Sequence, residues 1–234
     1  MYRKPVAVPD AARPRVRVTG NPVRAEVAAV ADMPYAAPAA GADFVLFSTG
    51  GSQGARFLGT TLPRAAALLP AALKARTRLV IQVRPEDMAG AEAALAGQGF
   101  AGVELAPFFA DMPARLAAAH LVVARSGAST VAELAAAGRP SLLVPLPGAI
   151  DDHQTANARA LVDAGAAIAM AQPAATPEAL ARAIADLAED PARLARMAEA
   201  ALGVGRADAE QHRDGKSAQH HAQGSPIIVR QGTM

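Results

Sequence analysis

Short apolar runs alternate with longer segments of helical periodicity along most of this chain of 234 residues. The apolar runs predict strands at 44–48, 78–83, 102–106, 121–124, 141–144 and 166–170. The segments around them predict helices at 55–74, 86–98, 111–119, 129–137, 152–164, 177–188 and 191–201. Short apolar strands that alternate with helices are typical of a parallel sheet covered on both faces. The expected fold class is therefore α/β.

The two ends of the chain lack this alternation. Residues 1–40 are rich in Pro and Ala and predict an extended connecting segment with one short strand at 15–18. Residues 206–234 are polar and aperiodic and contain Gly, which predicts a disordered tail. The predicted folded domain therefore spans residues 41–205.

Composition narrows the functional classes. Hydrophobic residues make up 52% of the chain but aromatic residues only 3%, so Ala and Leu must fill the core. A formal charge of +2 gives no electrostatic reason to expect nucleic acid as a partner. The chain has no Cys, which excludes disulfides and thiolate chemistry and fits a cytoplasmic protein. No apolar run approaches the roughly 20 residues of a membrane span, and the basic start lacks the apolar segment of a signal peptide. A soluble or at most peripheral protein is expected.

Two loops of small residues each follow a predicted strand and lead into a predicted helix. The first is Gly50-Gly51-Ser52-Gln53-Gly54, and the second is Arg125-Ser126-Gly127-Ala128-Ser129-Thr130, followed by Glu133 on the helix. Backbone amides at a helix start, together with the helix dipole, suit an anion such as a phosphate. The carboxylate of Glu133 is available for ribose hydroxyls. Two such loops in one α/β chain predict a nucleotide ligand.

Other nucleotide-binding and metal-binding patterns do not fit. The first loop does not give the G-x-G-x-x-G of a dehydrogenase, and neither loop is followed by the G-K-[ST] of a P-loop NTPase. The adjacent His220-His221 lie in the polar tail, and paired histidines without a fixed scaffold seldom make a specific metal site. We expect no metal and no cofactor.

Three segments, taken in order and spacing, resemble the MurG family, the N-acetylglucosaminyltransferases that convert lipid I to lipid II in peptidoglycan synthesis. The likeness runs from about residue 15 to about residue 208. The segments are Gly20–Arg24, 50–56 and 125–140, the last of which continues to Val144-Pro145 and 151–158. Gln82-Val83-Arg84-Pro85 departs from the family, whose members often have a Gly-containing turn there.

The resemblance implies a GT-B glycosyltransferase with two Rossmann-like halves, of which this chain looks like the C-terminal, donor-binding half. Residues 1–40 would then be the interdomain linker and a remnant of the N-terminal half, and 41–205 the UDP-GlcNAc-binding domain. The whole enzyme would be a hexosyltransferase that moves GlcNAc from UDP-GlcNAc to lipid I with inversion. Its acceptor half and catalytic residues are expected to be missing, so the chain alone should be inactive. A peripheral contact with the cytoplasmic face of the bacterial inner membrane is implied for the enzyme.

The resemblance also assigns the phosphate and ribose contacts, and each assignment has a simpler alternative. Ser52 would contact the diphosphate, or merely cap the following helix. Glu133 would bind the ribose, or complete a capping box with Thr130. Ala128, Ser129 and Thr130 of the second loop would also bind the donor. Arg24 would lie near the diphosphate, or be a solvated linker charge.

The remaining assignments concern the base and the sugar. Gln154, with His153 beside it, would contact sugar hydroxyls, or be an exposed residue in a first helical turn. Phe109 would read the uracil edge through its main chain, or be a core residue. Asp111 and Arg125 are expected to be structural, as a cap and a packing or loop contact.

Two alternative functions stay open. The chain could be the donor-binding subunit of a split glycosyltransferase, an arrangement similar to eukaryotic dolichol-linked N-acetylglucosaminyl transfer. It could also be a non-catalytic UDP-sugar-binding truncation product.

Overall fold

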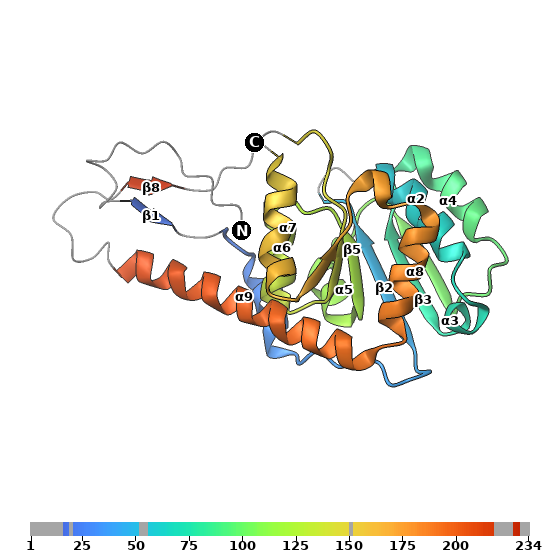
Figure 1. The fold of residues 1–234 in the computed structure, drawn as a ribbon, viewed down its shortest axis with the longest axis horizontal. Coiled ribbons are helices and arrows are strands. Elements are labelled where there is room, and N and C mark those ends of the chain that lie inside the picture. The colour runs from blue at the N-terminus through green and yellow to red at the C-terminus, as the bar shows by residue number, and fades with distance from the viewer. Residues whose placement is uncertain (1–15, 19–20, 52–55, 150–151, 218–226, 230–234) are drawn as a thin grey trace.

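The structure is a computed structural model that describes residues 16–18, 21–51, 56–149, 152–217 and 227–229. Its centre is a parallel sheet of six strands in the order β4-β3-β2-β5-β6-β7 (Figure 1). The strands are β2 (Phe44–Thr49), β3 (Thr77–Gln82), β4 (Gly102–Ala106), β5 (Leu121–Ala124), β6 (Ser141–Leu143) and β7 (Ala167–Ala169). The predicted strands and their parallel arrangement are confirmed, each end to within one residue.

Helices cover both faces of this sheet, and Figure 1 shows the sheet between the two layers. One face packs against α2 (Arg56–Ala67), α3 (Ala71–Ala75), α4 (Met88–Leu95) and α8 (Pro177–Ala188). The other packs against α1 (Ala25–Ala28), α5 (Met112–Ala118), α6 (Ala128–Ala137) and α7 (His153–Asp163). The last helix, α9 (Pro191–Ser217), contributes to both layers. The short 3-10 helices are η2 (Ala29–Asp32), η3 (Pro85–Asp87) and η5 (Gln172–Ala174).

Alternation along the strands divides the apolar side chains between two cores. Leu46 and Val123 lie in the core under α2 and α8, whereas their neighbours Phe47 and Val122 lie in the core under α5 and α6. Successive side chains of a strand point to opposite faces, so strands buried on both sides must be apolar at every position. This requirement explains why the strands appear in the sequence as continuous apolar runs.

The predicted helix at 55–74 is divided in the structure. α2 ends at Ala67, and α3 begins after Pro70, which occupies its N-cap position. Pro cannot donate the backbone hydrogen bond that a continuous helix needs there, and it restricts the residue before it.

The prediction of a purely extended segment over 1–40 is wrong for 25–32. This stretch forms α1 and η2, and its buried Val27 and Val30 pack against the layer of α5 and α6. A helix of one or two turns is stabilised by such packing rather than by local propensity, so its sequence carries little periodic signal. The expected short strand is present as β1 (Val16–Val18), which pairs with β8 (Ile227–Val229).

The expected end of the last helix at 201 is also wrong, and so is the expected disorder for 206–217, because α9 continues to Ser217. Residues 218–226 and 230–234 lie outside the described residues, so the prediction for them stays a prediction. Figure 1 shows this helix running out past α6 and α7. Gly205 allows the close packing: a Cβ built on it would lie 2.6 Å from the main-chain oxygen of Ala135 on α6. The glycine that suggests a break in the sequence is thus a helix–helix contact. Among the described residues, no helix is both long and apolar enough to cross a membrane.

Candidate functional site

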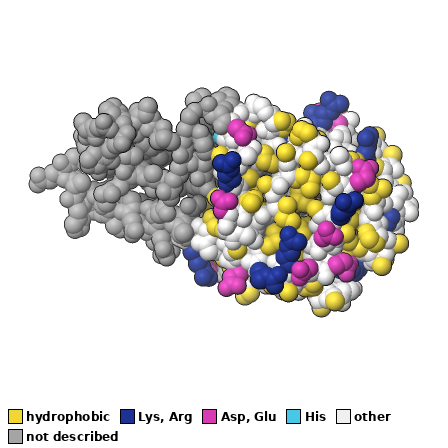
Figure 2. All heavy atoms as spheres, viewed as in Figure 1, with side chains coloured by type: hydrophobic (Ala, Val, Ile, Leu, Met, Phe, Trp, Pro, Cys, Tyr) yellow, Lys and Arg dark blue, Asp and Glu magenta, His cyan; other side chains and the backbone are white. Residues whose placement is uncertain are grey.

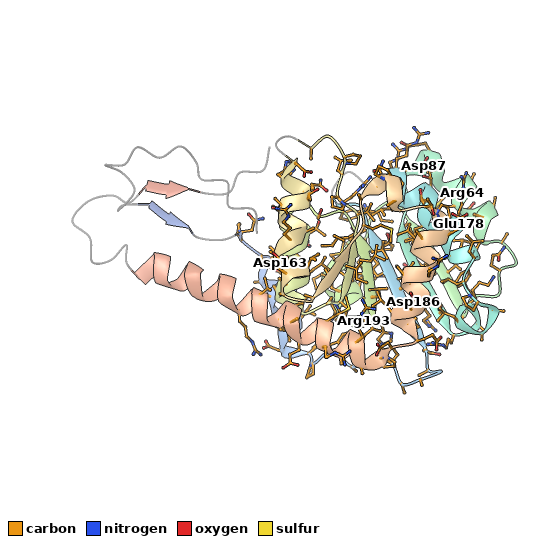
Figure 3. The ribbon with its side chains drawn as sticks, in the orientation of Figure 1. Arg64, Asp87, Asp163, Glu178, Asp186 and Arg193 are labelled. Atoms are coloured by element: carbon orange, nitrogen blue, oxygen red, sulfur yellow. The ribbon has the colours of Figure 1, made fainter. Side chains whose placement is uncertain are left out.

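The carboxyl ends of the parallel strands lie along one edge of the sheet, and the two loops of small residues follow β2 and β5 there. Ligands of open α/β sheets bind outside this edge. In Figure 3, Glu178 in the first turn of α8 lies toward this edge, and Arg193 at the start of α9 lies toward the opposite one. The carboxyl edge, with the loops that follow β2, β4, β5 and β6, is therefore the candidate site.

In the first loop the described amides are already engaged inside the protein. The Gly50 N–H donates to Gln82 Oε1 at 3.1 Å, and the Gly51 N–H donates to Thr49 Oγ1 at 3.3 Å. Gly51 has a φ of +82°, which turns the chain at that point. Ser52 lies outside the described residues, as do 53–55, so both interpretations of Ser52 stay predictions. Any phosphate-binding amides of this loop must come after Gly51.

The second loop is anchored by Arg125. Its buried guanidinium donates to the main-chain oxygens of Val144 and Pro145 at 3.0 and 3.1 Å and to Gln172 Oε1 at 2.6 Å. It also lies over the ring of Phe57, at 5.2 Å from the ring centre. Burial lowers the pKa of Arg125 from its usual value. These contacts tie the loop after β5 to the loop after β6, and the prediction that Arg125 is structural is confirmed.

The capping box of Thr130 and Glu133 does not form. The N-cap of α6 is Gly127, so Ala128, Ser129 and Thr130 are the first three helical residues. The first amides of a helix have no acceptor within it, and this end carries the positive part of the dipole. The start of α6 is therefore open to an anion, and Ser129 is exposed.

Glu133 instead makes an ion pair with Arg24. The Nε and Nη2 atoms of Arg24 donate to the same carboxylate oxygen, Oε1 of Glu133, at 3.1 and 3.0 Å. The Arg24 side chain is 55% exposed and that of Glu133 is 21% exposed. Arg24, at the N-cap position of α1, is thus paired with α6 while its side chain stays more than half exposed, and its role at the diphosphate stays a prediction.

The start of α7 is joined to both neighbouring loops. Gln154 Oε1 accepts from the Leu146 N–H at 3.0 Å, and the main-chain oxygen of Gln154 accepts from Ser126 Oγ at 2.8 Å. The buried Asn157 donates to the main-chain oxygen of Ser126 at 3.1 Å. Gln154 lies in the first turn of α7, as the alternative interpretation expected, but it is partly buried there and not exposed. The adjacent His153 begins α7, after Asp152 at a φ of 52°.

Phe109 has its side chain in the core. It is 4% exposed and meets Phe47 edge to face, with ring centres 5.7 Å apart, and the Arg115 guanidinium lies over its ring at 4.9 Å from the ring centre. The expected contact with the uracil edge, which lies in the loop after β4, is therefore left to the main chain of Phe109 and stays a prediction. Asp111 occupies the N-cap position of α5 without making a cap hydrogen bond, and it accepts instead from Arg115 Nε.

Sequence reasoning missed the residues that hold these loops. Gln82, Ser126 and Asn157 are all buried and hydrogen-bonded at the carboxyl edge. A signal existed for Gln82, since a polar residue ends an otherwise apolar strand, Leu79-Val80-Ile81-Gln82. Within the described residues there is no cluster of His, Cys, Asp and Glu that could hold a metal ion; His220 and His221 lie outside them.

Charged side chains on the face seen in Figure 2 are mixed in sign, with basic and acidic groups interspersed around an apolar centre. Nucleic acid binds to clustered basic side chains. This face therefore offers no basic patch for it.

Solved structures with this architecture place the fold as the C-terminal half of a GT-B glycosyltransferase. MurG of Acinetobacter baumannii matches with a TM-score of 0.62 and 29% identity, over 85% of this chain and 55% of that one. The glycosyltransferase WaaG matches with a TM-score of 0.60 at 17% identity, over 89% of this chain and 56% of that one, a likeness of fold alone.

The family is shown by the sequence: residues 45–214 match the glycosyltransferase family 28 C-terminal domain, and the chain belongs to this family. Curated relatives carry the name UDP-N-acetylglucosamine–N-acetylmuramyl-(pentapeptide) pyrophosphoryl-undecaprenol N-acetylglucosamine transferase. That of Methylobacterium radiotolerans is 54% identical over 205 residues, which cover 86% of this chain and 55% of the relative. That of Rhodospirillum rubrum is 52% identical over 201 residues, covering 86% and 51%. The resemblance to the C-terminal half of the MurG family is confirmed, and the chain spans about half the length of these relatives.

Proposed function

We propose that this chain is the donor-binding half of an enzyme that moves GlcNAc from UDP-GlcNAc to lipid I and so makes lipid II. The observation that carries the proposal is the arrangement at the start of α6, where an open helix end lies next to the paired Glu133 and Arg24. An anion site at the start of α6, with the carboxylate of Glu133 on the same helix and the guanidinium of Arg24 bound to it, fits a ribose that carries a diphosphate. The names of the two relatives above, at 54% and 52% identity, support the choice of donor and acceptor.

Each group at the carboxyl edge has a proposed part of the donor. The amides of Ala128, Ser129 and Thr130 bind diphosphate oxygens, helped by the dipole of α6 and by Ser52. The carboxylate of Glu133 accepts from the ribose hydroxyls. The main chain at Phe109 binds the uracil edge.

The sugar end of the donor is proposed to lie at the start of α7. His153 and Gln154 bind the hydroxyls of GlcNAc, since an amide can both donate to and accept from a hydroxyl. The side chain of Gln154 is held by the Leu146 N–H through Oε1, which orients its NH₂ group.

The proposed reaction is a single displacement with inversion. The C4 hydroxyl of the acceptor attacks the anomeric carbon of GlcNAc, the new C–O bond forms, and the bond to the diphosphate oxygen breaks with its electron pair leaving on UDP. The hydroxyl proton goes to a base on the acceptor half. Arg24 and the amides at the start of α6 stabilise the charge that develops on the diphosphate.

The chain alone is proposed to transfer no sugar. In this fold the reaction takes place between two halves, and one half cannot orient an acceptor hydroxyl. Correct orientation contributes about 7 to 11 kcal/mol at best to lowering a barrier. We propose residues 41–205 as the donor domain, and membrane contact on the cytoplasmic face as a property of the complete enzyme.

Isothermal titration with UDP, UDP-GlcNAc, UDP-glucose and ADP tests the binding part of the proposal. We expect binding of the uridine ligands and markedly weaker binding of ADP; equal binding of ADP, or no binding by a folded sample, contradicts the proposal.

A radiolabel transfer assay with a lipid I analogue tests the catalytic part. We expect no turnover by the chain alone. Turnover only when a separate acceptor half is added would favour a split transferase, and binding without turnover in both cases would favour a non-catalytic module.

A further inference from the structure

Gln82 connects the ends of three adjacent strands through one side-chain amide. It is the last residue of β3, which lies between β2 and β4 in the sheet, and it is 6% exposed. Its Oε1 accepts from Thr49 Oγ1 at 2.9 Å and from the Gly50 N–H at 3.1 Å, both at the end of β2. Its Nε2 donates at 3.1 Å to the main-chain oxygen of Pro107, directly after β4.

The network continues into the glycine loop. Thr49 Oγ1 donates to Gln82 and accepts from the Gly51 N–H at 3.3 Å. The amides of both glycines are thereby directed inward, immediately before the chain turns at Gly51 toward α2. The direction in which the loop leaves the sheet depends on these bonds.

We propose that Gln82 is a positioning residue of the nucleotide site, which sets Gly50 and Gly51, at the start of the glycine loop after β2, against the loop at 107–109 after β4. The inference rests on the proposed function, in which the first loop serves the diphosphate and the second the uracil. Through this one amide, the end of β2 and the chain after β4 are held at a fixed position relative to each other.

The chemistry of the position supports a role beyond stability. A buried strand end next to Ile81 and Val83 would most simply be apolar, because burying an amide is costly unless it is fully hydrogen-bonded. A neutral amide supplies, at every pH, an acceptor with two lone pairs on one side and a donor on the other. A carboxylate would repel the Pro107 oxygen, and an aliphatic chain would leave the Gly50 N–H unpaired.

The test compares Gln82→Met with Thr77→Val. Thr77 lies at the other end of the same strand, is fully buried, and donates to the main-chain oxygen of Leu73 at 2.7 Å. Thr77→Val removes this hydrogen bond and therefore controls for general damage to β3. Three quantities are measured on the full chain: amide hydrogen exchange at Gly50 and Gly51, UDP affinity by calorimetry, and the unfolding temperature. We expect Gln82→Met to speed exchange at both glycines at least tenfold and to weaken UDP binding at least tenfold, while Thr77→Val lowers only the unfolding temperature.

A second variant, Gln82→Glu, separates the donor from the acceptor. Its charged carboxylate can accept from Thr49 and Gly50 but opposes the Pro107 oxygen, whereas the protonated acid can make all three bonds. Burial and the adjacent carbonyl raise the pKa of such a carboxyl. We expect its UDP affinity relative to the unmodified chain to recover as the pH falls from 8 to 5.5; a ratio that stays constant contradicts a role for the donor.

The outcomes are distinguishable. UDP affinity of Gln82→Met within twofold of the unmodified chain, with faster exchange at the glycines, overturns the positioning role and leaves the proposed function intact. Failure of the unmodified chain to bind any uridine nucleotide refutes the proposed function instead. In that case hydrogen exchange alone tests whether Gln82 fixes the glycine loop. Faster exchange at Gly50 and Gly51 in Gln82→Met supports this role of Gln82, and unchanged exchange contradicts it.

Discussion

Arg24 and Glu133, which are 109 residues apart in the chain, form an ion pair through one carboxylate oxygen. Both Nε and Nη2 of Arg24 donate to Oε1 of Glu133. The pair joins the segment before the first central strand to the helix after β5. Both residues are proposed to bind the donor, one at the diphosphate and one at the ribose. Because they bind each other in the structure, the proposal predicts that donor binding exchanges this ion pair for two contacts with the ligand.

Replacing Glu133 tests the ribose contact. A hydrogen bond to a charged group contributes roughly 1.5 to 3 kcal/mol, so Glu133→Ala should weaken UDP binding about tenfold or more. The N-cap of α6 is Gly127, so the loss of about 1 kcal/mol expected for a missing cap should not appear in thermal unfolding. Glu189→Ala is the matched control, because Glu189 also pairs with an arginine, Arg76, at 2.8 Å. A lower unfolding temperature with unchanged UDP affinity would restore the capping interpretation.

Replacing Arg24 should affect uridine and UDP in opposite directions. Arg24→Ala frees the Glu133 carboxylate, and because exposed ion pairs contribute about 0.2 to 1 kcal/mol, uridine should bind up to about fivefold more tightly. UDP should bind more weakly, because it loses a guanidinium at the diphosphate. Calorimetry with both ligands checks this, and equal weakening of both would show that Arg24 does not compete for Glu133.

The stability of the fold should depend on the charge of His120. Burial, with a smaller contribution from Arg139, holds its pKa below the usual 6.5, and Asp43 only partly offsets this. In the folded chain His120 Nδ1 accepts from the Val45 N–H at 2.8 Å, which requires the nitrogen to be unprotonated. The unfolded chain therefore binds a proton more readily, so this contribution to stability is present above pH 6.5 and is lost as the pH falls toward and through the folded pKa.

His120→Asn isolates this effect, since an amide oxygen can replace the acceptor at Nδ1 but does not titrate. Thermal unfolding between pH 8 and 5 should show a steeper loss of stability in the unmodified chain than in His120→Asn. Parallel curves for the two proteins would exclude His120 as the source.

Two glycines of α9 test its packing on α6. Gly205→Ala places a methyl group 2.6 Å from the Ala135 oxygen and should destabilise the fold by about 1 to 3 kcal/mol. Gly203→Ala, where a Cβ meets nothing within 4 Å, should stabilise the helix by about 0.5 to 1 kcal/mol. Urea unfolding of both variants gives the comparison. Similar effects of the two substitutions would contradict the contact between the helices.

The central sheet could be predicted because its signal is local. β5 and β6 are buried on both faces, so Leu121–Ala124 and Ser141–Leu143 are short, bounded runs of mostly apolar residues. The helix at 177–188 is equally clear, since Thr176 caps it by accepting from the Ala179 N–H and Pro177 begins it. Local signals failed where packing decides: α1 is stabilised by contacts of Val27 and Val30, and α9 continues through two glycines because it packs on α6.

For the candidate site, the sequence by itself determined the two loops and the chemical groups that they carry, Ser129, Glu133 and Arg24 among them. The tertiary structure alone decided the partners of these groups. β2 lies between β3 and β5, an order that the chain does not reveal, and only this order brings Gln82 to the amides of the glycine loop. The pairing of Arg24 with Glu133 likewise depends on α1 docking against α6. Hydrogen bonds between residues far apart in sequence leave no periodic pattern, so they become visible only once the packing of the elements is known.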